Sequence, residues 1–153
     1  MQRIEIPQRE TIELHHAVFD VNGTLAVDGV LLPGVLDRLE RLATLVSITV
    51  LTAGTHGNME VLKETLNYPF HIIKTGEDKE RFVQQLGPAN VIAFGNGAND
   101  AAMLRLAAIG VAVMAAEGVA ISALQAADVL AQSPLDAIDL VLQPKRLVAT
   151  LRP

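Results

Sequence analysis

Oxygen-bearing side chains and glycines gather directly after two short apolar runs of the chain. Residues 19–24 read Phe-Asp-Val-Asn-Gly-Thr, and residues 93–100 read Ala-Phe-Gly-Asn-Gly-Ala-Asn-Asp. If both runs are strands, Asp20 and Asp100 lie near the carboxyl edge of a sheet, where open α/β folds bind ligands. Carboxylate and amide oxygens suit Mg²⁺, which needs only one or two carboxylates completed by water and substrate phosphate.

Each of these segments also has a purely structural interpretation. Asp is a common turn residue, so Asp20 could simply cap the turn that follows it. Asn96-Gly97 is a generic turn sequence, and Asn99 or Asp100 could cap the next helix. The residues alone leave both interpretations open.

A third strand end carries a hydroxyl group. Thr52 follows the β-rich run 47–51 and precedes Ala53-Gly54-Thr55. A hydroxyl and free amides at a strand-to-helix turn form a phosphate-binding cradle, although Thr and Gly are also ordinary loop residues. Lys79 lies in Glu77-Asp78-Lys79-Glu80, a pattern that by itself is typical of a solvated helix face. The histidines at 15, 16, 56 and 71 have no metal-ligand spacing, and no role is predicted for them.

The elements that must position these residues alternate along the chain. Repeated strand–helix pairs predict an α/β fold with a parallel sheet, right-handed crossovers and helices on both faces. An antiparallel N-terminal hairpin at a sheet edge is expected within residues 1–16, and a small flap with an Asp28-Gly29 turn within 25–33. Further strands are predicted at 17–19, 46–51, 70–73, 91–94, 109–113 and 128–130, and helices at 34–45, 59–66, 79–86, 98–107, 119–125 and the chain end. One domain spanning 1–153 accounts for all of them.

Composition limits the kind of protein this is. The 153 residues carry 12 basic and 17 acidic side chains, a formal charge of −5, which argues against a nucleic-acid-binding role. Half the residues are hydrophobic but only 3% are aromatic, so the core must be aliphatic. The chain has no cysteine, no signal-peptide pattern and no apolar run long enough to cross a bilayer. We therefore expect a cytoplasmic protein that does not associate with membranes.

The strand-end segments, in this order, resemble the haloacid dehalogenase (HAD) superfamily of phosphohydrolases, from about Ala17 to the end of the chain. Glu77-Asp78-Lys79 followed by Gly-Asn-Gly-Ala-Asn-Asp is similar to the phosphorylation domain of P-type ATPases. The resemblance is greatest to small soluble members of that kind without a cap domain. It implies a single Rossmann-like, doubly wound parallel sheet.

The resemblance also implies roles for individual residues. Asp20 matches the nucleophile that attacks phosphorus and becomes an aspartyl phosphate. Thr52, with Ala53 and Gly54 beside it, matches the segment that holds the transferring phosphoryl oxygens. Lys79 matches the lysine that neutralises the nucleophile and the phosphoryl group. A metaphosphate-like transition state needs such positioned positive charge and hydrogen-bond donors.

A Mg²⁺ cofactor is implied as well, at a site formed by Asp20, the backbone carbonyl of Asn22, Asn96 and Asp100. Asn22 stands where many of these phosphatases carry a second Asp that serves as general acid and base. Loss of such a group typically costs about 10²–10⁴-fold in rate. Slow dephosphorylation and a preference for activated donors such as acyl phosphates are therefore expected. Asn96 replaces a frequent metal-binding Asp, so the metal site is expected to be weak.

The chain has no room for a cap domain in 25–33 or between Thr52 and Lys79. An open site favours a macromolecular substrate, a broad substrate range, or closure by a neighbouring subunit of a homo-oligomer through the hairpin or the flap. The leading hypothesis is a Mg²⁺-dependent phosphohydrolase or phosphotransferase acting on a phosphorylated substrate of unknown identity. The alternatives are a catalytically silent regulator that binds phosphate or Mg²⁺ and, less favoured, a receiver-like domain phosphorylated on Asp20 by a partner.

Overall fold

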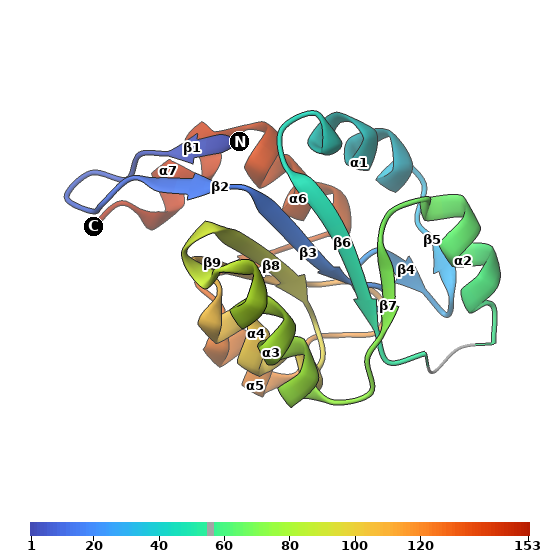
Figure 1. Cartoon of the computed structure of the whole chain (residues 1–153). Helices are drawn as coiled ribbons and strands as arrows, with labels where there is room; N and C mark the ends of the chain where they lie inside the picture. Colours follow the sequence, from blue (N-terminus) through green and yellow to red (C-terminus); the bar gives the residue numbers. More distant parts are fainter. Residues whose placement is uncertain (55–56) are drawn as a thin grey trace.

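The computed structural model of the chain describes residues 1–54 and 57–153, so the predicted loop residue Thr55 and His56 lie outside the described residues. A six-stranded parallel sheet with the order β10-β9-β8-β3-β6-β7 forms the centre of the molecule (Figure 1). Its strands are β3 (His16–Asp20), β6 (Ser47–Thr52), β7 (Phe70–Ile72), β8 (Val91–Gly95), β9 (Ile109–Val113) and β10 (Val129–Ala131). This arrangement confirms the predicted α/β fold with a parallel sheet.

Helices cover both faces of the sheet because the central strands are apolar on both sides, as is usual in parallel sheets (Figure 1). In β3, Ala17 and Phe19 face one apolar cluster, and Val18 faces the other. The first cluster includes residues of α1 (Val35–Ala43), α2 (Met59–Leu66), α6 (Pro134–Leu142) and α7 (Pro144–Leu151). The second includes residues of α3 (Gly76–Leu86), α4 (Ala101–Leu106) and α5 (Ile121–Ala126).

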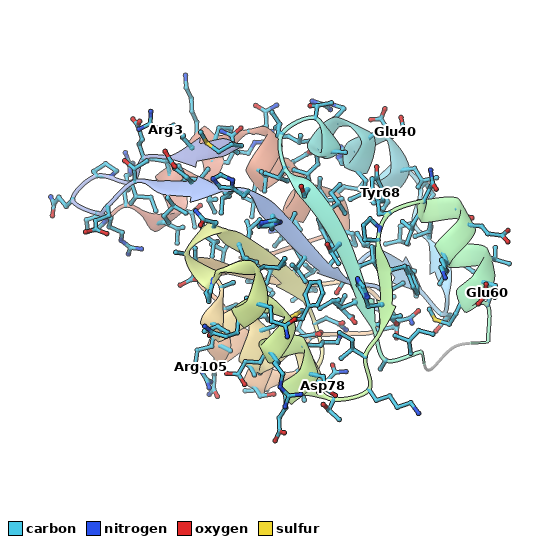
Figure 2. The ribbon with its side chains drawn as sticks, in the orientation of Figure 1. Arg3, Glu40, Glu60, Tyr68, Asp78 and Arg105 are labelled. Atoms are coloured by element: carbon cyan, nitrogen blue, oxygen red, sulfur yellow. The ribbon has the colours of Figure 1, made fainter. Side chains whose placement is uncertain are left out.

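Aliphatic side chains dominate both clusters, as the composition predicts. Phe19 and Phe94, on adjacent strands, stack with ring centroids 4.3 Å apart and add an aromatic contact beneath the strand ends. Charged side chains such as Glu40, Glu60 and Arg105 lie on the outside of the layers (Figure 2). Among the described residues, none of the helices has the length and apolar character needed to cross a membrane.

The N-terminal hairpin differs in place from the prediction. Strands β1 (Gln2–Ile4) and β2 (Ile12–Leu14) pair antiparallel, but they form a separate two-stranded sheet rather than an edge of the central one. Ile4, Ile6 and Leu14 are buried in the core of the same chain. The apolar side chains of the hairpin therefore contribute to the core of the chain itself.

The flap is present as predicted, with β4 (Ala26–Val27) and β5 (Val30–Leu31) joined by a two-residue turn. Asp28 and Gly29 both have positive φ, of 50° and 78°, the geometry that a tight hairpin requires. Val30 is 65% exposed on this flap.

The first turns of two helices near the candidate site differ from the prediction. α3 begins at Gly76 because the Thr75 side chain accepts a hydrogen bond from the Asp78 amide, which adds a turn before Lys79. The predicted helix 98–107 begins as a short 3₁₀ turn, η2 (Ala98–Asp100), before α4. A second 3₁₀ turn, η1 (Pro88–Asn90), precedes β8.

Candidate active site

Three charged residues from three elements meet at the carboxyl edge of the sheet. Asp20 ends β3, Asp100 ends η2, and Lys79 reaches them from the first turns of α3. Lys79 Nζ donates to Asp20 Oδ1 and to Asp100 Oδ1, each at 2.7 Å. Lys79 and Asp100 are fully buried, and Asp20 keeps 7% of its surface exposed. When both carboxylates are ionised, the cluster carries two negative charges and one positive charge.

The carboxylate of Asp100 organises the loop in which it lies. Its Oδ2 accepts hydrogen bonds from the backbone amides of Asn96 at 3.0 Å and Gly97 at 2.9 Å. A Cβ at Gly95 would lie 2.5 Å from the Asp100 carboxyl carbon, so only glycine allows this approach. With Oδ1 bonded to Lys79, both oxygens of Asp100 already accept hydrogen bonds.

Burial strongly affects the ionisation of this cluster. Desolvation, with the nearby Asp100 charge, raises the pKa of Asp20 to about 7, although Lys79 acts in the opposite direction. Burial alone would lower the pKa of Lys79, but the carboxylates of Asp20 and Asp100 outweigh it and raise that pKa above its ordinary value. Lys79 is therefore a permanent cation at neutral pH.

Thr52 lies at the same edge on the neighbouring strand. Leu51 is the register partner of Asp20, so Thr52 extends one residue beyond it. The Thr52 side chain is buried, its Oγ1 accepts from the Gly54 amide at 3.3 Å, and Gly54 has a φ of 72°. Ala53 is half-buried between them. The predicted phosphate-binding turn is thus a tight turn built around the Thr52 hydroxyl.

Asn96 joins three segments around the site. Its Oδ1 accepts from Thr24 Oγ1 at 3.4 Å, and its Nδ2 donates to the Gly118 carbonyl at 3.0 Å. A Cβ at Gly23 would lie 2.1 Å from Asn96 Nδ2, and Gly23 has a φ of 80°. Glycine at position 23 is therefore required for Asn96 to occupy this place. The amide tethers the loop after β9 through a bond that a carboxylate could not donate.

Asn22 presents an unpaired oxygen. Its Oδ1 is buried and has no hydrogen-bond partner among the described residues. Its backbone forms an isolated bridge with Ala26 at the base of the flap. An unsatisfied buried acceptor is costly, and such atoms are often accounted for by an ion, a water molecule or a functional role.

The flap is held between two other loops. The amide of Asp28 donates to Glu117 Oε2 at 3.3 Å, and Asn58 Nδ2 donates to the Gly29 carbonyl. Thr24, Asn58 and Gly118 are not predicted from the sequence to take part in the site. Gly118 carries a weak sequence signal, because glycine is common in turns and Gly118 does have a positive φ. Its hydrogen bond to Asn96, 22 residues away, has no signal in the sequence.

The donor set fits a small, hard cation. The oxygens of Asp20, Asn22 and Asn96 lie on the two strand-end loops, and such ligands suit Mg²⁺ when water and phosphate complete the coordination. Across residues 1–54 and 57–153 there is no cluster of three His, Cys, Asp or Glu side chains that could hold a metal alone. Asp100 is already bonded to three N–H donors, so it contributes mainly through Lys79 and the loop.

Solved structures with the same fold are known. A putative 3-deoxy-D-manno-octulosonate 8-phosphate phosphatase from Vibrio cholerae has 14% identity and a TM-score of 0.70, with 95% of this chain and 97% of that chain covered. The corresponding phosphatase from Moraxella catarrhalis, solved with magnesium, phosphate and KDO, has 14% identity and a TM-score of 0.64, with coverages of 91% and 94%. At this identity the two likenesses establish the fold.

A zinc-transporting PIB-type ATPase has 25% identity and a TM-score of 0.63, with 78% of this chain and 20% of that chain covered. An uncharacterised protein, MJ0073 of Methanocaldococcus jannaschii, is 39% identical over 62 residues, which are 40% of this chain and 67% of that protein. The model of haloacid dehalogenase-like hydrolases matches residues 51–135, a segment that contains Thr52, Lys79, Asn96 and Asp100. The chain therefore belongs to the haloacid dehalogenase-like hydrolase family.

Proposed function

We propose that this protein is a Mg²⁺-dependent phosphatase or phosphotransferase that forms an aspartyl phosphate on Asp20. The observation that carries the proposal is the buried bridge of Lys79 between Asp20 and Asp100, with 2.7 Å contacts on both sides. A buried lysine between two carboxylates at a strand end contributes little to stability but places fixed positive charge beside a nucleophile. The family and the phosphatases of the same fold support this assignment.

The contacts distinguish the two oxygens of Asp20. Oδ1 accepts from Lys79, and the carboxylate also has a backbone hydrogen bond from Val21; we assign the attack on phosphorus to Oδ2. As the new Oδ2–P bond forms, the bond from phosphorus to the leaving oxygen breaks, and its electron pair departs with that oxygen. In a second displacement, a water oxygen attacks phosphorus, the Asp20 carboxylate leaves with the electron pair of the broken bond, and the proton of the water passes to the released phosphate. Covalent capture divides one difficult displacement into two easier ones.

The remaining residues stabilise charge on the transferring group. Lys79 offsets negative charge beside Asp20, and the Thr52 hydroxyl with the Ala53 amide would donate to phosphoryl oxygens. The Gly54 amide, which donates to Thr52 Oγ1, would join them by turning from that oxygen to the phosphoryl group. Mg²⁺, held by Asp20, the Asn22 carbonyl and Asn96, would neutralise a further phosphoryl oxygen and lower the pKa of Asp20. The phosphatase from Moraxella catarrhalis was solved with magnesium and phosphate, which supports this cofactor.

The leaving group determines which substrates react. Asn22 cannot release a proton at neutral pH, and both oxygens of Asp100 already accept hydrogen bonds. Departure of a sugar alkoxide would therefore be slow, whereas an acyl or aryl oxygen can leave without a proton. We propose activated phosphates as the substrate class, with hydrolysis of the aspartyl phosphate as the slow step.

The proposal is tested by incubating the protein with Mg²⁺ and acetyl phosphate. Released phosphate and the intact mass after acid quenching are measured beside an Asp20→Asn control. We expect phosphate release, together with a phosphoryl adduct that is stable in acid and absent from the control. Asn22→Asp should accelerate loss of the adduct by about 10²–10⁴-fold, the usual contribution of a positioned acid–base group.

Asn96 favours the alternative of a silent binding protein, because its amide serves as a tether to Gly118. That alternative predicts neither release nor adduct at millimolar Mg²⁺, together with phosphate-induced thermal stabilisation that survives in Asn22→Asp. A phosphoenzyme that forms only with a partner kinase would instead indicate a receiver-like domain. Either result would overturn the proposed activity.

A further inference from the structure

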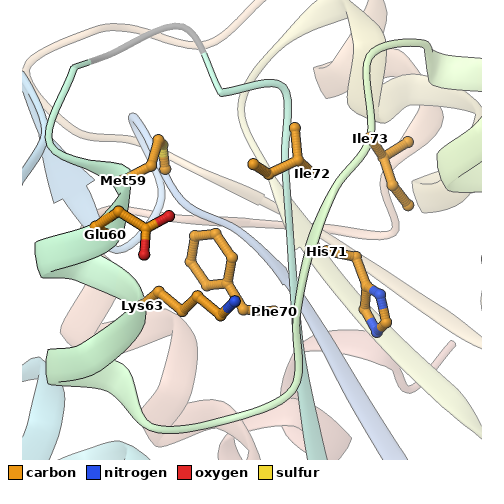
Figure 3. A pocket seen from close by; sticks show the side chains of 7 residues that line it. All are labelled: Met59, Glu60, Lys63, Phe70, His71, Ile72 and Ile73. Atoms are coloured by element: carbon orange, nitrogen blue, oxygen red, sulfur yellow. The ribbon is translucent and has the colours of Figure 1, made fainter.

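A recess of about 400 Å³ lies between α2 and the edge strand β7, beside the Thr52 turn. Figure 3 shows Met59, Glu60 and Lys63 of α2 facing Phe70 and Ile72 of the strand. We propose that this recess binds the non-reacting part of the substrate and selects leaving groups with an apolar, flat body. The inference rests on the proposed function and adds the substrate class that the site prefers.

Two contacts join the wall of the recess to the predicted phosphate-binding turn of the candidate site. The Ile73 amide donates to the Thr52 carbonyl at 2.7 Å, which ties the end of β7 to the predicted phosphate-binding turn. A Cβ on Gly54 would lie 3.3 Å from Ile72 Cγ2, so the turn packs directly on the recess wall. A group held against Ile72 is therefore held beside the turn that would bind the phosphoryl oxygens.

The spacing of the sheet sets the length of the ligand. Asp20 ends β3, and β7 lies two strands away across β6. Neighbouring strands are roughly 4.8 Å apart, so the recess lies about 10 Å from Asp20 along the sheet edge. Acetyl phosphate is too short to span this distance, whereas the phosphate ester of a fused two-ring phenol is long enough.

Apolar contact is the basis of selection in the recess. Met59, Phe70 and Ile72 provide apolar surface, and Ile72 is 58% exposed. Glu60 and Lys63 carry opposite charges, so the recess has no strong preference for either sign. A pocket of this volume that combines apolar surface with a few polar side chains is typical of small-molecule sites.

His71 and Ile73 also line the recess, but the His71 ring lies outside its apolar wall. The His71 side chain points away from α2 (Figure 3). Its ring centroid lies 5.2 Å from that of Phe82 on α3. The selecting surface therefore consists of the apolar residues of one strand face and the facing side of α2.

The test compares two donors in one assay, acetyl phosphate and 4-methylumbelliferyl phosphate, with kcat/KM measured for each. Both have leaving groups that need no proton, so their ratio reports contact with the ring system. We expect Ile72→Ser to lower the ratio of the umbelliferyl ester to acetyl phosphate about tenfold, which corresponds to about 1.4 kcal/mol. Met59→Ser, on the facing helix, should lower it in the same direction.

Two matched controls carry the same type of change outside the recess. Val61 on α2 is 62% exposed, and Leu130 on β10, the opposite edge strand, is 43% exposed. Val61→Ser and Leu130→Ser should leave the ratio unchanged. An unchanged ratio in both recess variants, or equal losses in the controls, would overturn the recess as a selecting surface while the proposed activity stands. Failure of the wild-type protein to react with either donor would overturn the proposed activity and this inference together.

Discussion

Lys79 determines the electrostatics of the site at the scale of single residues. It is buried between two carboxylates, so removal of its charge would leave Asp20 and Asp100 uncompensated in a low-dielectric environment. Even with Lys79 present, the raised pKa of Asp20 means that ionising this residue costs folding free energy. The folded protein is therefore less stable when Asp20 is ionised, which is the form that acts as a nucleophile.

This cost predicts a pH-dependent stability difference between wild type and Asp20→Asn, measured in a metal chelator. The ordinary pKa of Asp is 3.8, and that of Asp20 in the folded protein is about 7. Between these values the folded state holds a proton that the unfolded state has lost, so wild-type stability falls as the pH rises. The Tm of Asp20→Asn should therefore exceed that of wild type by an amount that grows from about pH 4 to pH 7 and then levels off.

Titrations elsewhere in the chain are common to both proteins and cancel in this difference. At about 2–4 °C per kcal/mol for a domain of this size, the gap should reach several degrees. A difference that is constant across the pH range would show that Asp20 has an ordinary pKa in the folded protein.

At the scale of elements, two side chains hold the loop from β8 to α4 in place by hydrogen bonds, one to the backbone of the loop and one to a neighbouring loop. Asp100 accepts from two loop amides, and Asn96 donates to the loop after β9. Asn96→Asp removes that donor and sets a carboxylate against the Gly118 carbonyl. We expect a loss of about 1–3 kcal/mol in the free energy of unfolding without metal, from denaturant unfolding in a chelator.

The same variant tests whether Asn96 lies at the metal. An added carboxylate at a Mg²⁺ site strengthens binding, so millimolar Mg²⁺ should raise the Tm of Asn96→Asp more than that of wild type. Equal Mg²⁺-induced rises in Tm for both proteins would show that residue 96 is not a metal ligand. Ca²⁺ at the same concentration provides the comparison for ion selectivity.

The strand ends can be predicted from the sequence because their signals are local. An apolar run followed by Asp, Thr or Gly identifies the ends of β3, β6 and β8 within a few residues. The predicted start of α3 is three residues late because the cap at Thr75 depends on a hydrogen bond from Asp78, three residues away. Contacts such as Thr24 with Asn96, 72 residues apart, have no local signal and follow only from the assembled sheet.

At the scale of the whole molecule, the described residues 1–54 and 57–153 form no cap over the strand ends, so closure of the site becomes a question of assembly. The N-terminal hairpin is less suited to a subunit contact than its sequence indicates, since Ile4 and Leu14 are buried within the chain. Val30 on the flap remains exposed, and the flap is bonded to Glu117 and Asn58 beside the candidate site. We therefore propose the flap as the contact through which a neighbouring copy covers the site.

Light scattering tests this contact by giving the mass of the protein in solution, which is compared with the chain mass of 16.3 kDa. We expect a multiple of that mass for wild type and a shift toward the monomer for Val30→Asp, because a buried unpaired carboxylate opposes association. Leu130→Asp, with a similar exposed side chain on the far edge strand, should keep the wild-type mass. If the flap closes the site, Val30→Asp should also raise KM for acetyl phosphate, whereas Leu130→Asp should not. A wild-type protein of monomeric mass would contradict closure by a second copy and would leave a site that remains open to large substrates.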